Sequence, residues 1–444
     1  MKRIYEHFAY GDGPIERCYW NQFLAKDELS FPSVTDDISC DFAIVGAGFT
    51  GITAAIRLAE HGADVVVVDA QTPGWGASGR NGGLVSVGGS NLSDKQIETK
   101  FGTEDAQSYF LAERAAVDLV ERLIVEHQID VDRHSNGYTF AAHNQKSIAS
   151  VKAYGEQYYR RYGLKSQFLD KQDMISAGMA SEEFHGAVNL PVGFALNPAK
   201  LMSGLLRAAQ TKGVRIYANS VVEDISEHNG FELRTKLGQI RAKKLLIATN
   251  GYSSDDVPSK LAGRYMPVQS NILVTRPLSQ EEIAAQGWSS RQMVVDARNL
   301  LHYFRLLPDN RLLFGLRGSV RASANSLAQT EQVARADFDR FFPSWANVET
   351  EYFWSGLICM SRNLVPFAGP LRGMDNAFAA MAYHGNGVSM APYCGALVAD
   401  IALGQQKMPH PYCMQKQMRK FELGSLRRHL LPPAFAWYKM LDRQ

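Results

Sequence analysis

The sequence is poor in the features that mark disulfide-rich, metal-binding or membrane proteins. Its 444 residues include five cysteines, an odd number, and none of them forms a Cys-x-x-Cys pair. This indicates neither a disulfide framework nor a zinc site, and we expect no bound metal and a reducing, cytoplasmic location. No apolar run reaches the roughly 18 residues of a membrane span, and residues 1–12 lack the apolar core of a signal peptide.

A large net charge is also missing. The chain carries 47 Lys and Arg against 45 Asp and Glu, which gives a formal net charge of +2. Because no strong basic field results, we expect small-molecule partners and no nucleic acid. With 45% hydrophobic and 21% charged residues the composition is that of an ordinary globular protein, and the length suggests two or three domains.

The most informative segment that is present is a glycine-rich turn between two short apolar runs. Residues 42–45 lead into Gly46-x-Gly48-x-x-Gly51, a helical pattern follows, and a second apolar run over 65–68 ends at Asp69. Glycines at this spacing allow a tight turn, close approach of a pyrophosphate and close helix packing, while the acid accepts hydrogen bonds from a ribose. The segment therefore predicts a dinucleotide-binding unit over about 40–70.

Two further glycine-rich loops, 76–83 and 383–388, need the same explanation. A nicotinamide enzyme uses one such loop, whereas FAD is longer and is buried along its whole length. The loop at 383–388 opens a helix, whose N-terminal N–H groups favour negative charge on a reduced flavin. We therefore favour FAD over a nicotinamide cofactor. The predicted cofactor-binding residues are Gly46, Ala47, Gly48, Phe49, Thr50, Gly51, Asp69, Ala70, Gly76, Ala77, Ser78, Arg80, Asn81, Gly82, Gly83, Leu84, Val222, Ala248, Thr249, Gly251, Gly385, Asn386, Gly387 and Val388.

The remaining patterns predict an α/β fold (α+β overall) with two kinds of sheet. Helices are expected at 103–127, 144–161, 197–211 and 388–403, and strands at 137–142, 215–217, 221–225, 231–235, 243–249 and 377–382. Strands dominate 266–318, which differs from the α/β start of the chain. We expect a Rossmann-like FAD-binding domain assembled from discontinuous segments and a substrate domain with a large, mostly antiparallel sheet. The predicted parts are an N-terminal arm (1–38), a FAD-binding domain (39–110, 195–265 and 355–425), a substrate-binding domain (111–194 and 266–354) and a C-terminal tail (426–444).

Several motifs together resemble one family of flavoproteins. They are Val45-Gly-Ala-Gly-Phe-Thr-Gly51, Gly76-Ala-Ser-Gly-Arg-Asn-Gly-Gly83, Ala248-Thr-Asn-Gly-Tyr252, Trp354-Ser-Gly356, Pro366-Phe-Ala-Gly369 and His384-Gly-Asn-Gly387. From about residue 38 to 405 the chain resembles the D-amino-acid-oxidase-type (glycine/sarcosine oxidase-like) FAD-dependent oxidoreductases. Within this family it is most similar to the γ-glutamylputrescine oxidase-like amine oxidases.

This resemblance implies oxidation of a carbon–nitrogen bond in an amine or amino acid. Hydride transfer to flavin N5 leaves an imine that water hydrolyses, and oxygen or another acceptor reoxidises the flavin. It also implies catalytic or substrate contacts at Tyr303, Arg305 and His384, and a substrate contact at His302. Tyr303 and Arg305 are two residues apart, so both point to one face of a strand. On residue type alone, Arg305 is equally a solvated or structural ion-pair residue, and a histidine such as His384 is more often a packing or hydrogen-bonding residue than a proton shuttle.

The chain departs from the family pattern at two positions. Where α-amino-acid oxidases of the family carry an arginine that pairs with the substrate carboxylate, this chain has Ile358. An aliphatic side chain cannot do this, which favours an amine, or a carboxylate bound elsewhere. Asn386 stands where histidine is common, and we expect it to contact the flavin edge. Cys359 is offset from the cysteine that binds flavin covalently in some sarcosine oxidases, so we expect non-covalent FAD and a buried Cys359.

Other interpretations stay open at this point. The enzyme passes electrons either to oxygen or, as a dehydrogenase, to a quinone or carrier; a flavin-binding or RNA-modifying protein is the remaining alternative. Arg80 and Asn81 either contact the flavin or cap the loop. The apolar run at 430–441 is either a peripheral membrane contact or a tail packed on the body.

Overall fold

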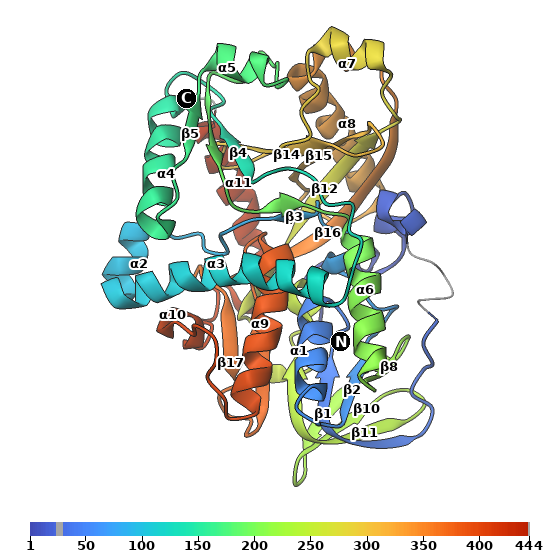
Figure 1. Ribbon diagram of the computed structural model, residues 1–444. Helices are drawn as coiled ribbons and strands as arrows, with labels where there is room; N and C mark the ends of the chain where they lie inside the picture. Colours follow the sequence, from blue (N-terminus) through green and yellow to red (C-terminus); the bar gives the residue numbers. More distant parts are fainter. Residues whose placement is uncertain (24–29, 443–444) are drawn as a thin grey trace.

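The computed structural model describes residues 1–23 and 30–442. Residues 24–29 of the predicted arm and 443–444 of the predicted tail lie outside the described residues. Two large β-sheets form the framework, one at each end of the molecule (Figure 1). Helix α3 (Thr103–Glu126) crosses the middle of the molecule between them.

The first sheet has a parallel centre that carries the predicted dinucleotide unit. Its main path runs β17 (Phe367–Pro370), β18 (Ala377–Met381), β11 (Gln239–Ile247), β1 (Asp37–Val45), β2 (Val65–Val68) and β8 (Arg215–Tyr217). The strands from β18 to β8 are mutually parallel, and β9 (Asp224–Glu227) and β10 (Phe231–Arg234) extend β11 as an antiparallel ribbon. All four valines of β2 are buried, as expected for a parallel strand covered on both faces.

Helices cover one face of this sheet. Side chains of Phe42 and Ile44 pack with α1 (Phe49–Ala59), α6 (Pro198–Thr211) and α9 (Gly387–Ala402) in one core. The intervening Ala43 points to the other face, where the β9–β10 ribbon packs. Alternation along β1 thus builds two cores from one strand. The start of α6 is fixed by its N-cap, because the side chain of Asn197 accepts hydrogen bonds from two backbone N–H groups of the first turn.

The second sheet is mostly antiparallel. Its order is β16 (Thr350–Ser361), β12 (Tyr265–Thr275), β15 (Leu312–Arg317), β14 (Tyr303–Leu306), β13 (Met293–Asp296), β4 (Tyr138–Ala141), β6 (Ala187–Leu190) and β5 (Gln167–Leu169). Only the β13–β4 pair among these described strands is parallel. An aromatic core with Phe304 and Phe314 packs one face against α7 (Gln280–Gln286) and α8 (Ala324–Phe341). The other face turns toward the first sheet. Each sheet with the helices packed on it is called a domain here, the first or the second in this order.

The predicted fold class is confirmed, and most predicted elements exist. The predicted helix over 144–161 is α4 (Ser147–Tyr162), and the helix after the third glycine loop is α9. The strand predicted at 221–225 exists as β9 but begins three residues later, at Asp224. The chain just before it still follows the end of β2, where the N–H of Ser220 donates to the carbonyl of Asp69 (2.8 Å). Strand β16 also runs unbroken through the predicted domain boundary at 354–355.

Both chain ends pack against the body. The ring of Tyr5 and the side chain of Leu431 share a cluster with Leu357, and Arg428 donates to both carboxylate oxygens of Glu6 at 2.7 and 2.9 Å. The C-terminal helix α11 (Leu431–Leu441) buries Leu431. Smaller helices complete the periphery: α2 (Asp94–Phe101), α5 (Lys171–Ser176) and α10 (Tyr412–Gln415).

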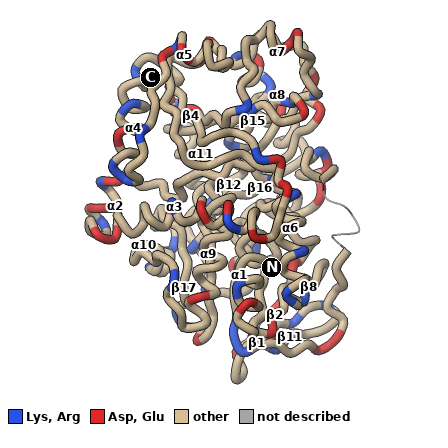
Figure 2. The backbone as a smooth tube through the Cα atoms, in the orientation of Figure 1, with Lys and Arg blue, Asp and Glu red and all other residues tan. Residues whose placement is uncertain are grey.

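Charged residues of both signs are interspersed over both domains (Figure 2), in keeping with the net charge of +2. Within the described part of the chain, no helix combines the length and the apolar character needed to cross a bilayer.

Candidate cofactor and active site

The turn after β1 has no room for side chains. Gly46 has φ +108°, and a Cβ there would lie 2.8 Å from the carbonyl oxygen of Ala248. A Cβ on Gly51 would lie 1.9 Å from the carbonyl oxygen of Gly46, so only glycine lets α1 start this close to the strand. The N-terminus of α1 therefore opens onto the space above the turn, which is the geometry that binds phosphate.

Asp69 closes this turn from the end of β2. Its Oδ2 accepts a hydrogen bond from the N–H of Ala47 (2.7 Å), and its Oδ1 accepts one from the N–H of Gln71 (2.9 Å). Burial raises the pKa of Asp69 to about 6, although these N–H groups act in the opposite direction. The carboxylate lines the cleft described below, and its contact with a ribose stays a prediction.

The second glycine-rich loop is held in shape by Asn81. Its side-chain amide donates to the carbonyls of Ala77 (3.1 Å) and Ser78 (2.8 Å) and accepts from the N–H of Gly83 (2.8 Å). The indole N–H of Trp20, from the N-terminal arm, donates to the carbonyl of Asn81 (2.9 Å). Asn81 therefore caps the loop from within, which was the structural alternative to a flavin contact.

Arg80 lies in the same loop, and one nitrogen of its guanidinium has no hydrogen-bond partner among the described residues. Its guanidinium stacks 3.9 Å from the centre of the Trp75 ring, Nε donates to the carbonyl of Trp75 (2.7 Å), and Nη1 donates to that of Ser355 (3.2 Å). Nη2 is buried without a hydrogen-bond partner among the described residues. A buried donor without a partner costs about 1–3 kcal/mol, so this nitrogen is suited to a ligand acceptor.

The third loop joins the first at a tyrosine. The hydroxyls of Tyr383 and Thr50 are 2.7 Å apart, which links the start of α9 to the first turn of α1. His384 follows with φ +52°, and its Nε2 lies 3.4 Å from the N–H of Ser361. Burial lowers the pKa of His384 to about 4, so the imidazole is neutral at pH 7. Its Nδ1 has no partner among the described residues.

Asn386 is the residue before α9, and both polar atoms of its side-chain amide form hydrogen bonds with Ser86. Its Nδ2 donates to the carbonyl of Ser86 (2.9 Å), and its Oδ1 accepts from the Ser86 hydroxyl (3.2 Å). The amide thus fixes the third loop to the segment that follows the second loop. The contact of Asn386 with the flavin edge stays a prediction. If it forms, the Asn386 amide would bond to the flavin in addition to Ser86.

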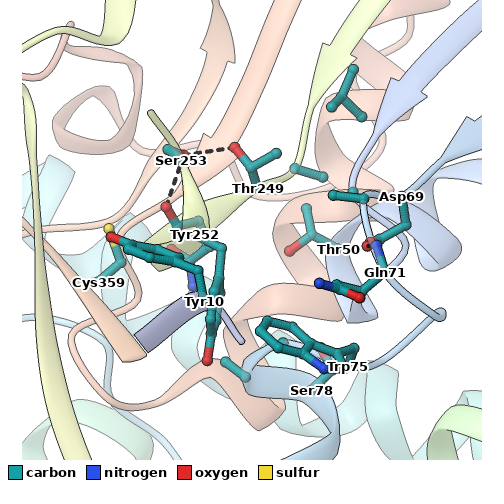
Figure 3. Close-up of a pocket in the computed structure, with 18 of the residues that line it drawn as sticks. Tyr10, Thr50, Asp69, Gln71, Trp75, Ser78, Thr249, Tyr252, Ser253 and Cys359 are labelled. Carbon is teal, nitrogen blue, oxygen red and sulfur yellow. Dashed lines mark hydrogen bonds between the residues drawn. The ribbon is translucent and has the colours of Figure 1, made fainter. Parts of the chain in front are cut away.

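The three loops line one cleft of about 700 Å³, within the size range of ligand pockets. Predicted cofactor residues in its lining are Gly46, Gly48, Phe49, Thr50, Asp69, Ala70, Gly76, Ala77, Ser78, Asn81, Val222, Ala248, Thr249, Gly385, Gly387 and Val388. The other predicted ones stand outside this lining: Ala47, Gly51, Arg80, Gly82, Gly83, Leu84, Gly251 and Asn386. Figure 3 shows Tyr10 and Cys359 on one side of the cleft and Thr50 and Asp69 on the other.

One wall of the cleft was not foreseen from the sequence. Tyr10 of the N-terminal arm packs edge-on against Tyr252 (centroids 6.3 Å apart), which packs against Trp75 (5.6 Å). Arg3 lies 4.2 Å from the centre of the Tyr10 ring and also lines the cleft. The arm carries no recognisable sequence motif, so only the tertiary structure brings it to the cleft. Of the residues in this wall, only Tyr252 belongs to one of the family motifs named above.

Tyr303 and Arg305 share one face of β14, as predicted, and both meet the second loop. A Cβ on Gly82 would lie 2.6 Å from the Tyr303 ring, whose hydroxyl is 3.2 Å from that of Ser270. Arg305 is fully buried and donates to the carbonyls of Gly82 and Leu196. Burial lowers the pKa of Arg305 to about 9. These contacts make Arg305 an anchor behind the loop and outside the cleft lining, and any substrate role for it stays a prediction.

His302 lies away from the cleft lining, in an ion-pair network of the second domain. Its Nδ1 is 2.8 Å from Asp296 and its Nε2 is 3.2 Å from Asp337, while the ring stacks on Phe314. Burial opposes protonation, but the hydrogen bonds to the two carboxylates outweigh it and raise the pKa of His302 to about 9. This network accounts for His302 without a substrate.

Comparison with known proteins decides the family. A family model described as FAD dependent oxidoreductase (DAO) matches residues 41–401. The chain belongs to this family of FAD-dependent oxidoreductases. Gamma-glutamylputrescine oxidoreductase of Escherichia coli is 33% identical over 380 residues, 86% of this chain and 87% of that protein. The probable oxidoreductase OrdL of Rhizobium meliloti is 31% identical over 434 residues, 97% and 99% of the two chains.

The fold comparison agrees. The crystal structure of glycine oxidase from Geobacillus kaustophilus matches with a TM-score of 0.70 at 21% identity, covering 86% of this chain and 100% of that one. The predicted family, fold class and FAD cofactor are thereby confirmed.

The flavoprotein's cleft fits this cofactor on its own geometry. The space beside Gly46 and Gly48 admits no Cβ, and the helix α1 opens onto it. Burial raises the pKa of Cys359, which lines the cleft, to about 12, so its thiol stays protonated and suits non-covalent binding. In the described part of the chain, no cluster of three or more His, Cys, Asp or Glu residues could hold a metal ion.

Proposed function

We propose that this flavoprotein oxidises the carbon–nitrogen bond of an amine or amino-acid-type substrate, such as a γ-glutamyl polyamine or another secondary amine. When bound, FAD accepts the hydride from the carbon next to nitrogen. Water then hydrolyses the imine product to a carbonyl compound and an amine or ammonia. Similarity to gamma-glutamylputrescine oxidoreductase over 86% of the chain supports this substrate class.

The observation that carries the proposal is a section of the cleft in which the described lining residues include no strong base. Ile358 and Cys359 of β16 line it, and His384, next to the lining residue Gly385, is neutral because burial lowers its pKa to about 4. A neutral amine needs no proton abstraction before it loses a hydride. The protein's own part is to hold the amine, exclude water and keep the reacting carbon in place.

Anaerobic reduction of the bound flavin tests the proposal. The purified holoprotein is mixed with polyamines, γ-glutamyl amines, N-methyl amino acids, cyclic imino acids and D-amino acids, and the flavin absorbance is followed. We expect bleaching with at least one amine class. If none of these compounds bleaches the flavin, the proposed function is wrong.

The electron acceptor is a separate question with two candidates, oxygen and a quinone or carrier. A membrane quinone is favoured by α11, on which Trp437, Tyr438 and Met440 are 57%, 41% and 45% exposed. Oxygen uptake with peroxide release identifies an oxidase. Cosedimentation with vesicles, compared between wild type and a Trp437→Ser, Tyr438→Ser variant that keeps the Leu431 anchor, tests the peripheral membrane contact. The cytoplasmic location stays a prediction.

A further inference from the structure

Arg317 ends β15 on the face of the second sheet that meets the cofactor loops. In the register of the sheet it pairs with Ser270 of β12, which pairs in turn with Gly356 of β16. Paired residues point to the same face, and a Cβ on Gly356 would lie 3.3 Å from the Cβ of Arg80 in the second loop. The row that contains Arg317 therefore faces the first domain.

The guanidinium of Arg317 lies at the edge of the cleft. Gly385, which lines the cleft, has φ +103°, and a Cβ there would lie 3.7 and 3.8 Å from the two terminal nitrogens of Arg317. Arg317 interacts electrostatically with Tyr303, whose hydroxyl lies beside Ser270, and with His384 of the third loop. Arg317 thus lies between the Tyr303 side of the sheet and the third loop.

No anion in the described part of the chain neutralises this cation. Among residues 1–23 and 30–442, none accepts a hydrogen bond from Arg317 or forms an ion pair with it. The buried Arg427, in contrast, is paired with both oxygens of Asp255 at 2.8 Å. Burial lowers the pKa of Arg317, which records the same lack of compensation. A half-buried guanidinium without a partner is unfavourable unless a ligand supplies the anion.

We propose that Arg317 binds the carboxylate of the substrate, so that the substrate class is an amine that carries a carboxylate. The inference rests on the proposed function for the amine half of the molecule. Ile358 lies on the same face, two strands and two residues from Arg317, or about 12 Å between Cα atoms at standard sheet spacings. The carboxylate is therefore held well away from the apolar wall at Ile358, which suits an extended substrate such as a γ-glutamyl amine.

Binding of an unreactive anion tests the site without turnover. Glutarate, with neutral glutaramide for comparison, is titrated into the holoprotein and the flavin absorbance is followed. We expect Arg317→Met to weaken glutarate binding by about 10- to 100-fold, the range for losing a charge-assisted hydrogen bond, and Arg317→Lys to weaken it less. The matched control Arg321→Met, an exposed position on the next loop, leaves it unchanged. Failure of glutarate to bind wild type, or equal binding by Arg317→Met, overturns the proposal.

Flavin reduction by γ-glutamylputrescine and by putrescine separates the two proposals. Arg317→Met should raise the apparent Kd only for the compound with a carboxylate. If no amine reduces the flavin, the proposed function fails while the glutarate titration still decides Arg317. A Tm at or above that of wild type is expected for Arg317→Met, because no internal partner is lost; a clear drop in Tm would assign Arg317 a structural role instead.

Discussion

Replacing His302 by glutamine tests whether this residue is structural. In the folded protein its ring bonds Asp296 and Asp337, and these bonds raise its pKa to about 9 from an ordinary value of 6.5. A raised folded-state pKa adds stability that is fully present below pH 6.5 and is lost as the pH rises through 9. Wild type should therefore lose stability across this window through the deprotonation of His302.

The size of this stability loss follows from the difference between the unfolded and folded pKa values of His302. Two and a half pH units at about 1.4 kcal/mol per unit give a loss of about 3 kcal/mol between pH 6.5 and 9. His302→Gln cannot take up the proton, so its free energy of unfolding should be lower than that of wild type at pH 6.5 and should approach it near pH 9. The exposed His228→Gln serves as a control without carboxylate partners in the described structure.

Urea unfolding at several pH values measures this difference. Trp288 and Trp345 are buried in the same core as His302's neighbours Phe314 and Phe341, so tryptophan fluorescence reports on this domain. A pH dependence equal in His302→Gln and wild type would refute the reasoning. An intact stability profile combined with a raised substrate Kd would instead restore His302 as a substrate contact.

Two more predictions concern the cofactor. Gly51→Ala places a Cβ 1.9 Å from the Gly46 carbonyl oxygen, so we expect a stability loss of about 1–3 kcal/mol and little bound flavin, measured by absorbance; Gly369→Ala, with no atom within 4 Å of the new Cβ, should retain it. Deleting residues 1–10 removes one wall of the cleft, so the Kd for FAD should rise at least about tenfold, measured by flavin fluorescence. An unchanged Kd would show that the arm does not enclose the cofactor.

The sequence was most predictive where function depends on local backbone. The turn at Gly46 and Gly51 was predictable because its steric demands involve residues close together in the chain. Helix α8 was missed although Ser323 and Ser326 form a capping box at its start, a signal that was there to be found.

The residues around the cleft were harder to predict because their partners are distant. Arg305 has the same side chain whether it meets a carboxylate or, as here, the carbonyls of Gly82 and Leu196. Tyr10 reaches Tyr252 only through tertiary packing. The strand predicted at 221–225 was placed too early, because the chain before Asp224 contacts the end of β2 despite the β propensity of its valines.

The junction of the two chain ends has a consequence for biosynthesis. Glu6 and Arg428 are 422 residues apart in the sequence, yet their ion pair joins the arm to the segment before α11. During translation the arm emerges first, and its partners at Tyr252, Asp256 and Ala322 follow well before Arg428. The ion pair with Arg428 is therefore the last of these contacts to become available, and it fastens the arm only when nearly the whole chain has been synthesised.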